Sequence, residues 1–316
     1  MRRIHFRSGN SRIFDDIIMN HGKQLRLFLP DGTPSGPRYY ELVNWTGQAV
    51  VMPVSRIKEL VTGAWPEFER PGIYLVRGES EEGHARLYIG ESENVAKRVQ
   101  GHPATLGFEV TELLMFSSKD DNLTKSHVLW LESALIDLAT TAKRTTLSNS
   151  TAPLTKALSK AEQATMVEFL EHLGLVAQTA GFNYFTEARS RKVGSAPTAQ
   201  FSLHKVKQGI KAQAIQSDEG FVVLAGSRAS GNPTEALAKG YAQQREALIE
   251  QGVMKLESNG NYVFTVDAVF ASPSAAASIV AGYPISGPQS WVDQNGVPLK
   301  DLLEKEKLTG GAVDLT

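Results

Sequence analysis

Two short apolar runs in the stretch PGIYLVRGESEEGHARLYIGES, residues 71–92, constrain the fold more than any other feature of the sequence. A charged, glycine-bearing segment separates them, which is typical of the connection between two antiparallel strands. The first run carries Gly-Ile-Tyr at 72–74, and the second carries Tyr-Ile-Gly at 88–90. The sequence therefore predicts a hairpin with two tyrosines, each close to a glycine, on neighbouring strands.

The residues after this hairpin predict two helices and a third strand. Residues 92–102, SENVAKRVQGH, predict a helix with Ser92 as its N-cap, and residues 108–118, FEVTELLMFSS, predict a strand. Residues 122–142 repeat apolar side chains at helical spacing and carry Glu132 in their middle. An unpaired carboxylate in an apolar helix is costly if buried, so Glu132 is either a functional residue or turned to solvent.

The flanking segments predict further strands and a helix. Residues 23–53 alternate apolar and polar side chains around two turn clusters, which indicates short antiparallel strands. Residues 159–174 predict a helix that starts with the capping box Ser159-x-x-Glu162 and ends at Gly174. A basic stretch at 186–200 indicates a flexible linker.

The C-terminal part predicts a second small α+β unit. Two strands pair around residues 218–220, a helix covers 234–252, and a hairpin turns at Asn259-Gly260. Ser272 is the expected cap of a further helix, with Pro273 at its first position. The expected organisation is a strand-rich segment at 1–69, a catalytic domain at 70–150, a helix and basic linker at 151–217, an accessory domain at 218–308 and a tail at 309–316.

Composition limits the chemistry that this chain can perform. The sequence has no cysteine, which excludes thiol nucleophiles, disulfides and thiolate-bound zinc. A metal would need oxygen or imidazole ligands, and these favour Mg²⁺ or Mn²⁺. Neither a bilayer-spanning apolar run nor the apolar core of a secretory signal is present, so we expect the cytoplasm and no membrane partner.

Charge is distributed unevenly beneath a formal net charge of -1. Residues 1–70 carry ten Lys and Arg against seven Asp and Glu, and residues 151–217 carry eight against four. The other two segments are acidic, with eight against eleven at 71–150 and seven against twelve at 218–316. A polyanion could bind the two basic segments, and a solvated charged surface explains the same counts equally well.

The two triplets, followed by Glu91-Ser92, Arg98, His102 and a helical Glu132, resemble the GIY-YIG endonuclease family over about residues 70–150. Arg98 follows Tyr88 by ten residues, and His102 lies one helical turn further on, so both would project from one helix face. The resemblance implies an α+β fold in which helices flank a small antiparallel sheet. It also implies a single divalent metal site and hydrolysis of phosphodiester bonds in DNA.

The resemblance assigns a role to each of these side chains. Glu132 would bind Mg²⁺ or Mn²⁺, and Arg98 would clamp the phosphate with its planar guanidinium. Tyr74 or Tyr88 would be the general base if adjacent cations lowered its phenol pKa, and the sequence leaves this choice open. His102 would accept or relay a proton.

Three further residues are weaker candidates for the same site. Gly72 and Gly90 would allow the backbone to approach the substrate. Asn149 occupies the place of the asparagine that this family carries after the glutamate-bearing helix, although a turn asparagine is common for its local hydrogen bonding. The second histidine of some members has no counterpart, because His127 is too close to Glu132 in the sequence.

The segment from 218 to 308 resembles a small domain of uncertain function that accompanies some GIY-YIG proteins, through FVVLAGSRAS, FTVDAVFASPSAAASIVAG and SWVDQNGVPLKDL. This resemblance implies DNA targeting, with modified DNA as a candidate substrate. Trp291, Ser272 and Ser274 are the candidate contacts. Equally, Trp291 would fill the core and Ser272 would only cap a helix.

The sequence thus predicts a metal-dependent DNA endonuclease of the GIY-YIG type. The alternative is a catalytically inactive protein that keeps this fold and binds DNA or regulates other proteins, since a fold does not guarantee an activity. A third possibility is that the substrate is RNA or a branched DNA structure. Motifs for a phosphate-binding loop, a serine nucleophile elbow, an HExxH zinc site and an EF-hand are missing from the sequence.

Overall fold

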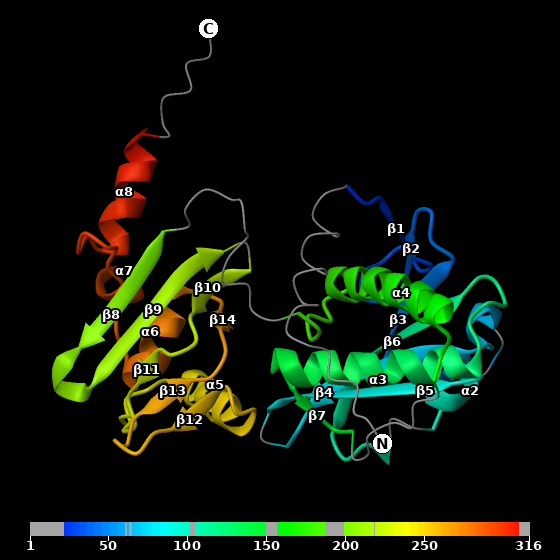
Figure 1. Cartoon of the computed structure of the whole chain (residues 1–316), viewed down its shortest axis with the longest axis horizontal. Helices are drawn as coiled ribbons and strands as arrows, with labels where there is room; N and C mark the ends of the chain where they lie inside the picture. Colours follow the sequence, from blue (N-terminus) through cyan, green and yellow to red (C-terminus); the bar gives the residue numbers. More distant parts are fainter. Residues whose placement is uncertain are drawn as a thin grey trace, which may run out of the picture. The chain divides into compact units, whose positions relative to one another are not determined.

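The structure is a computed structural model that describes residues 22–60, 62, 65–81, 83–101, 105–149, 157–186, 199–217 and 219–309. The chain divides into two compact units. Unit 1 comprises Met1–Thr141 and Thr145–Phe185, and unit 2 comprises Ala142–Arg144 and Thr186–Thr316. Both units combine helices with a mainly antiparallel sheet (Figure 1), which confirms the predicted α+β class.

Unit 1 is built on a seven-stranded sheet with the order β1-β2-β3-β6-β4-β5-β7. All neighbouring strands are antiparallel except β5 and β7. The strands are β1 (Leu25–Phe28), β2 (Arg38–Leu42), β3 (Gly47–Pro53), β4 (Gly72–Glu79), β5 (Ala85–Ser92), β6 (Glu109–Ser118) and β7 (Thr146–Leu147).

The predicted hairpin is the pair β4 and β5, and β6 is the predicted third strand. The segment before residue 70 does not stand apart from this sheet. β3 pairs with β6 along its whole length, from Gly47 opposite Ser118 to Pro53 opposite Glu112. The reason is burial, because the six residues of β3 before Pro53 are all buried and need a layer on each side.

The helices of unit 1 cover both faces of the sheet. They are α2 (Val95–Val99), α3 (Lys125–Ala142) and α4 (Lys160–Thr179), with 3-10 helices η1 (Val54–Leu60) and η2 (Pro66–Phe68). Alternate residues of β4 separate the two cores: Ile73 packs in the core that contains α3 and α4, and Tyr74 packs in the core that contains α2, η1 and η2.

The helix ends test the predicted caps. Ser159 and Glu162 form the predicted capping box of α4. That helix does not end at Gly174 but continues to Thr179, because residues of its last turns pack in the core. The N-cap of α2 is Asn94 rather than Ser92: the Asn94 side chain accepts from the backbone N–H of Lys97, and the Ser92 hydroxyl bonds to the Asn94 backbone.

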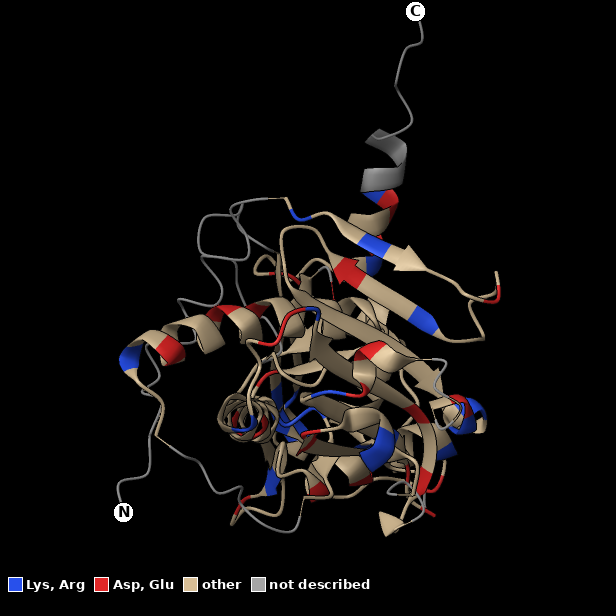
Figure 2. Cartoon of the chain, turned by 90° about the vertical axis from the view of Figure 1, so that its right-hand side faces the viewer, with Lys and Arg blue, Asp and Glu red and all other residues tan. Residues whose placement is uncertain are grey.

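Ion pairs within unit 1 involve three of the six described basic residues of the opening segment, Arg38, Arg56 and Arg70, and also Arg77 and Lys119 of the next segment. Arg38 and Arg77 both bind the Glu112 carboxylate, and Arg38 Nη2 lies 2.6 Å from Glu112 Oε1. Lys119 lies 2.5 Å from the carboxylate of Glu41. Basic and acidic residues are accordingly interspersed on the side drawn in Figure 2. Four of the ten basic residues of this segment lie outside the described residues, so both interpretations of the basic opening segment stay predictions.

Unit 2 has a second seven-stranded sheet, with the order β12-β13-β11-β9-β10-β14 and with β8 paired to β9. Its strands are β8 (Gln200–Lys205), β9 (Ile210–Ser217), β10 (Gly220–Val223), β11 (Arg228–Ala229), β12 (Met254–Leu256), β13 (Tyr262–Phe264) and β14 (Ala268–Phe270). The helices are α5 (Lys239–Glu250), α6 (Pro273–Ala281), α7 (Gly287–Ser290) and α8 (Leu299–Thr309), with the 3-10 helix η4 (Val206–Gln208).

This sheet begins at Gln200, well before the expected domain start at residue 218. Strand β8 directly follows the predicted basic linker. Its sequence does carry a strand signal, because apolar Phe201 and Leu203 alternate with polar neighbours. The predicted turn at Asn259-Gly260 joins β12 and β13. No helix in the described ranges is long and apolar enough to cross a membrane.

Candidate functional site

The strand register places Tyr74 of β4 opposite Gly90 of β5. The tyrosine is 1% exposed, and its ring occupies the space beside the glycine. A Cβ atom at Gly90 would lie 2.5 Å from the Tyr74 hydroxyl oxygen, so a larger residue would displace the ring. This close packing explains why a tyrosine and a glycine face one another on the two strands.

Tyr88 and Arg98 complete a polar group on the α2 side of the sheet. Tyr88 is half-buried and its ring centroid lies 6.0 Å from that of Tyr74. Arg98 is exposed on α2 and donates from Nε to the Tyr74 hydroxyl at 3.3 Å. The hydrogen bond to Tyr74 is the main reason why the pKa of Arg98 is raised. We call Tyr74, Tyr88 and Arg98 the tyrosine–arginine group.

The pKa of Tyr74 is raised by its own surroundings, so only an added cation could lower it as a general base requires. Burial raises the pKa of Tyr74 above its ordinary value, and the nearby Tyr88 raises it further. Arg98 acts in the opposite direction but does not outweigh burial. Because Tyr88 is the more exposed of the two, it is the better placed to contact water or a substrate.

Glu132 of α3 lies close to a second carboxylate, Glu91, to which the sequence analysis assigned no role in the site. Burial, followed by the charge of Glu91, raises the pKa of Glu132 to about 7, while Lys125 and the backbone N–H of Glu91 oppose that shift. Lys125 Nζ lies 2.6 and 2.7 Å from the two carboxylate oxygens of Glu91. Glu132, Glu91 and Lys125 form the carboxylate–lysine group.

Glu91 and Lys125 each had a sequence signal that could have revealed them. Glu91 directly follows the Tyr-Ile-Gly triplet, and Lys125 lies two turns before Glu132 on the same helix. The sequence does not predict the contact between Glu91 and Lys125, because this contact depends on how α3 packs against β5.

The two groups lie at the same end of the sheet but on opposite faces. Ile89 and Glu91 alternate with Tyr88 and Gly90 along β5, and Ile89 belongs to the core that contains α3. Glu91 therefore points to the α3 side, where Glu132 and Lys125 lie. The tyrosine–arginine group points to the α2 side. A phosphate that contacted both groups would lie at the end of β5.

The carboxylate–lysine group fits one hard divalent cation. Mg²⁺ commonly binds through one or two protein carboxylates and retains several waters, so Glu132 and Glu91 are a sufficient donor set. The raised pKa of Glu132 means that its negative charge is poorly compensated, which a cation would relieve. Within the described ranges, no three His, Asp or Glu side chains converge as a metal cage.

The Asn149 side chain forms two hydrogen bonds with the backbone of β5. Its side-chain oxygen accepts from the Ile89 backbone N–H at 3.1 Å, and its side-chain nitrogen donates to the Ile89 carbonyl at 2.7 Å. The oxygen and the nitrogen of the Asn149 amide are thus both hydrogen-bonded to the backbone of Ile89. This gives Asn149 a structural role beside the candidate site, while its catalytic role stays a prediction.

Two further expectations concern Gly72 and His102. A Cβ atom at Gly72 would overlap the Phe116 carbonyl oxygen, so the glycine allows two strands to approach each other. Both Gly72 and Gly90 are buried, and contact with a substrate is not needed to explain either one. His102 lies outside the described residues.

Trp291 is a core residue, which corrects its expected place at a DNA-contact surface. Its side chain is 0% exposed and packs on Phe221 with ring centroids 5.1 Å apart. The indole N–H donates to the Pro273 carbonyl at 3.0 Å. Ser272 caps α6 by accepting from the Ala275 N–H, as its alternative interpretation predicts. Ser274 accepts from a backbone N–H of α7.

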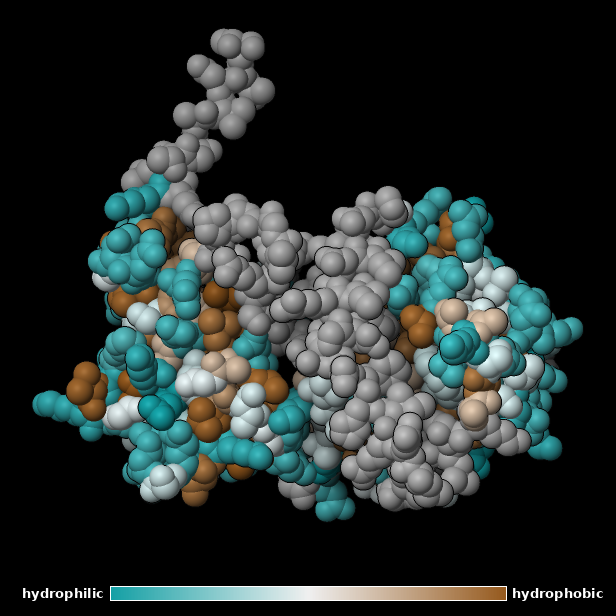
Figure 3. Space-filling model, in the orientation of Figure 1, coloured by the Kyte–Doolittle hydropathy of each residue, from teal (hydrophilic) through white to brown (hydrophobic). Residues whose placement is uncertain are grey.

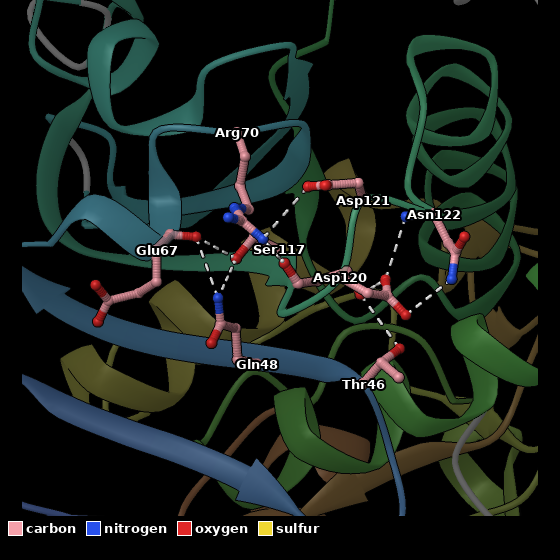
Figure 4. Close-up of polar contacts among 9 residues, drawn as sticks. Thr46, Gln48, Glu67, Arg70, Ser117, Asp120, Asp121 and Asn122 are labelled. Atoms are coloured by element: carbon pink, nitrogen blue, oxygen red, sulfur yellow. Dashed lines mark hydrogen bonds and ion pairs between the residues drawn. The ribbon is translucent and has the colours of Figure 1, made fainter.

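A polar network holds the segments that support the candidate site (Figure 4). Arg70, just before β4, donates from Nη1 to the Ser118 carbonyl at 2.9 Å, and its own carbonyl accepts from Val95 at the start of α2. The Ser118 hydroxyl donates to Asp120 at 2.7 Å, which lowers the pKa of Asp120. The network therefore links β4, α2 and the loop that leads into α3.

Comparison with known proteins identifies one family, and it concerns unit 2. Residues 201–303 match a domain of unknown function, DUF4357. No curated protein and no solved structure matches the chain. The match covers most of the segment that the sequence predicts to be an accessory domain. The GIY-YIG resemblance of residues 70–150 rests on their motif residues and stays a prediction.

Proposed function

We propose that the chain is a metal-dependent endonuclease that hydrolyses phosphodiester bonds in DNA through a GIY-YIG type of site. The observation that carries this proposal is Glu132, a half-buried carboxylate next to a second carboxylate, at the sheet end where Arg98 contacts Tyr74. Such a perturbed carboxylate is more often found at a functional site than on an ordinary helix.

Each group then has a task in the hydrolysis. Arg98 donates to Tyr74 and is also hydrogen-bonded to Tyr88, and the remaining N–H groups of its exposed guanidinium can donate to a phosphate oxygen. Tyr88 orients the attacking water or accepts its proton, and His102 relays a proton. Glu132, assisted by Glu91, holds Mg²⁺ or Mn²⁺, which would neutralise charge that develops on the phosphate oxygens.

A catalytically inactive DNA-binding or regulatory protein is the second candidate. The observation that favours it is Lys125, which already neutralises Glu91 and so occupies one of the two carboxylates. In that case the buried polar residues would only stabilise the fold.

Nicking of supercoiled plasmid separates the two candidates. Wild type, Glu132→Ala and the control Glu168→Ala, which removes an exposed carboxylate from α4, are compared with Mg²⁺, with Mn²⁺ and with EDTA. The endonuclease proposal requires metal-dependent nicking by wild type and by Glu168→Ala, reduced by about 10³-fold or more in Glu132→Ala. Equal nicking by all three proteins would overturn it, and so would nicking in EDTA.

A further inference from the structure

The strand register of unit 2 brings basic residues from four strands into one row. His204 lies opposite Lys211, Lys211 opposite Arg228, Arg228 opposite Val263, and Val263 opposite Lys255. Directly opposed residues of antiparallel strands point to the same face of a sheet. We call these five residues the basic row.

The basic row lies on the face of the sheet that is turned away from the core of unit 2. Phe201, Leu203, Ala212 and Ala214, which alternate with row residues on β8 and β9, pack in the core with α6. The four basic members of the row are exposed. Their side chains are therefore available to a partner, whereas the opposite face is filled by the protein.

The charge of this region differs from that of the rest of the unit. Residues 199–217 contain three lysines and a histidine and no acidic residue. Arg228 binds Glu257 in a two-pronged contact at 2.8 and 3.3 Å. No described acidic residue forms an ion pair with Lys211 or Lys255. In the described part of the opening segment of unit 1, by comparison, Arg38, Arg56 and Arg70 have carboxylate partners.

The dimensions and composition of the basic row fit the sugar-phosphate backbone of a duplex. Five strands at a spacing of about 4.8 Å span roughly 19 Å, enough to reach several phosphates. The row has no Phe, Tyr or Trp, so it lacks the large aromatic platforms on which single-stranded bases stack. At the turn between β8 and β9, Val206 is 91% exposed between Lys205 and Lys207. Figure 3 shows hydrophobic atoms among hydrophilic ones at this tip, at the far left.

We propose that the basic row of unit 2 binds the phosphate backbone of duplex DNA without reading its sequence. The inference rests on the proposed function in taking DNA as the polyanion. It explains how a unit with an overall acidic balance can bind DNA, because the contact is confined to one face of one sheet. Its function would be to hold the substrate while the site in unit 1 acts on it.

The test is the salt dependence of DNA binding by the full chain. Fluorescence anisotropy with a labelled 30-base-pair duplex, in EDTA so that no cleavage intervenes, compares wild type with the Lys211→Ala/Lys255→Ala variant. The matched control is Lys239→Ala/Lys300→Ala, which removes the same charge from helices α5 and α8 of the same unit. All four lysines are exposed, so both variants are expected to fold.

The row variant should bind about tenfold more weakly at moderate salt, and the slope of log K against log salt should fall by about 1.8. The control variant should keep the wild-type slope. Equal slopes for both variants would overturn the proposal, as would an absence of DNA binding by wild type. Plasmid cleavage that persists while the slopes stay equal would reject the row and retain the nuclease. A smaller slope in the row variant, without any metal-dependent cleavage of plasmid, would retain the basic row and reject the nuclease.

Discussion

In unit 1 both faces of the central strands are buried, by α3 and α4 on one side and by α2 and the two 3-10 helices on the other. In unit 2 the main core fills one face of the sheet. The other face has a small buried cluster around Ile215 and Val222 and exposed basic residues where β8, β9, β11 and β12 lie. The difference decides where function can be placed. A sheet covered on both faces can offer polar groups only at the ends of its strands, whereas an open face can contact a long polymer directly.

The two faces of the second sheet should respond very differently to mutation. Trp291→Ala removes a fully buried indole, its contact with Phe221 and its hydrogen bond to Pro273, so unit 2 should lose about 3–5 kcal/mol of stability. The Lys211→Ala/Lys255→Ala variant, on the open face, should change stability by less than about 0.5 kcal/mol per site. Urea denaturation followed by circular dichroism measures both. Similar losses in the two variants would remove the distinction between the faces.

The close packing inside the first sheet can be tested at a glycine. Gly90→Ala places a Cβ atom against the Tyr74 ring, and we expect a loss of about 2–3 kcal/mol together with reduced cleavage. Gly174→Ala is the control, because nothing lies within 4 Å of its Cβ position in α4, and it should stabilise the protein by about 0.5–1 kcal/mol. Thermal unfolding measures the change in stability of both variants. An unchanged melting temperature in Gly90→Ala would contradict the close packing of Tyr74 against Gly90.

The buried carboxylate at the end of the first sheet should make stability depend on pH. The pKa of Glu132 is raised from 4.5 to about 7 in the folded protein, so folding retains a proton that the unfolded chain releases between these values. Stability is therefore lost as pH rises from about 4.5 to 7. Glu132→Gln should match wild type at pH 4 and exceed it by roughly 2 kcal/mol at pH 8 in EDTA.

Urea titrations at the two pH values measure this difference, and Mg²⁺ at pH 8 provides the control. A cation bound by Glu132 should stabilise wild type and leave Glu132→Gln unchanged. An equal stability difference at pH 4 and pH 8 would show that Glu132 is not a raised-pKa carboxylate.

Features that follow from local periodicity could be predicted from the sequence. The hairpin of β4 and β5, the long helix α3 and the capping box of Ser159 and Glu162 all depend on residues close together in the chain. The N-cap of α2 was misplaced because Ser92, Glu93 and Asn94 offer two good capping side chains within three residues. Local propensity alone cannot choose between them.

Features that depend on long-range packing could not be predicted. The burial of Trp291 depends on Phe221, seventy residues earlier in the chain, and the pairing of Glu91 with Lys125 depends on where α3 crosses β5. The sequence identified Tyr74, Arg98 and Glu132 as one set. The structure adds that the tyrosine–arginine group and the carboxylate–lysine group lie on opposite faces, which only the register along β5 shows.

The central claim is that these two groups act on one phosphate at the end of β5. A double-mutant cycle tests it directly, with single-turnover plasmid cleavage in Mg²⁺ by wild type, Arg98→Lys, Glu132→Asp and the double variant. These conservative changes are chosen to leave measurable rates. If both groups contact the same phosphate, the double variant should be slowed less than the product of the two single effects. Effects that multiply would contradict the claim and place the two groups in separate sites.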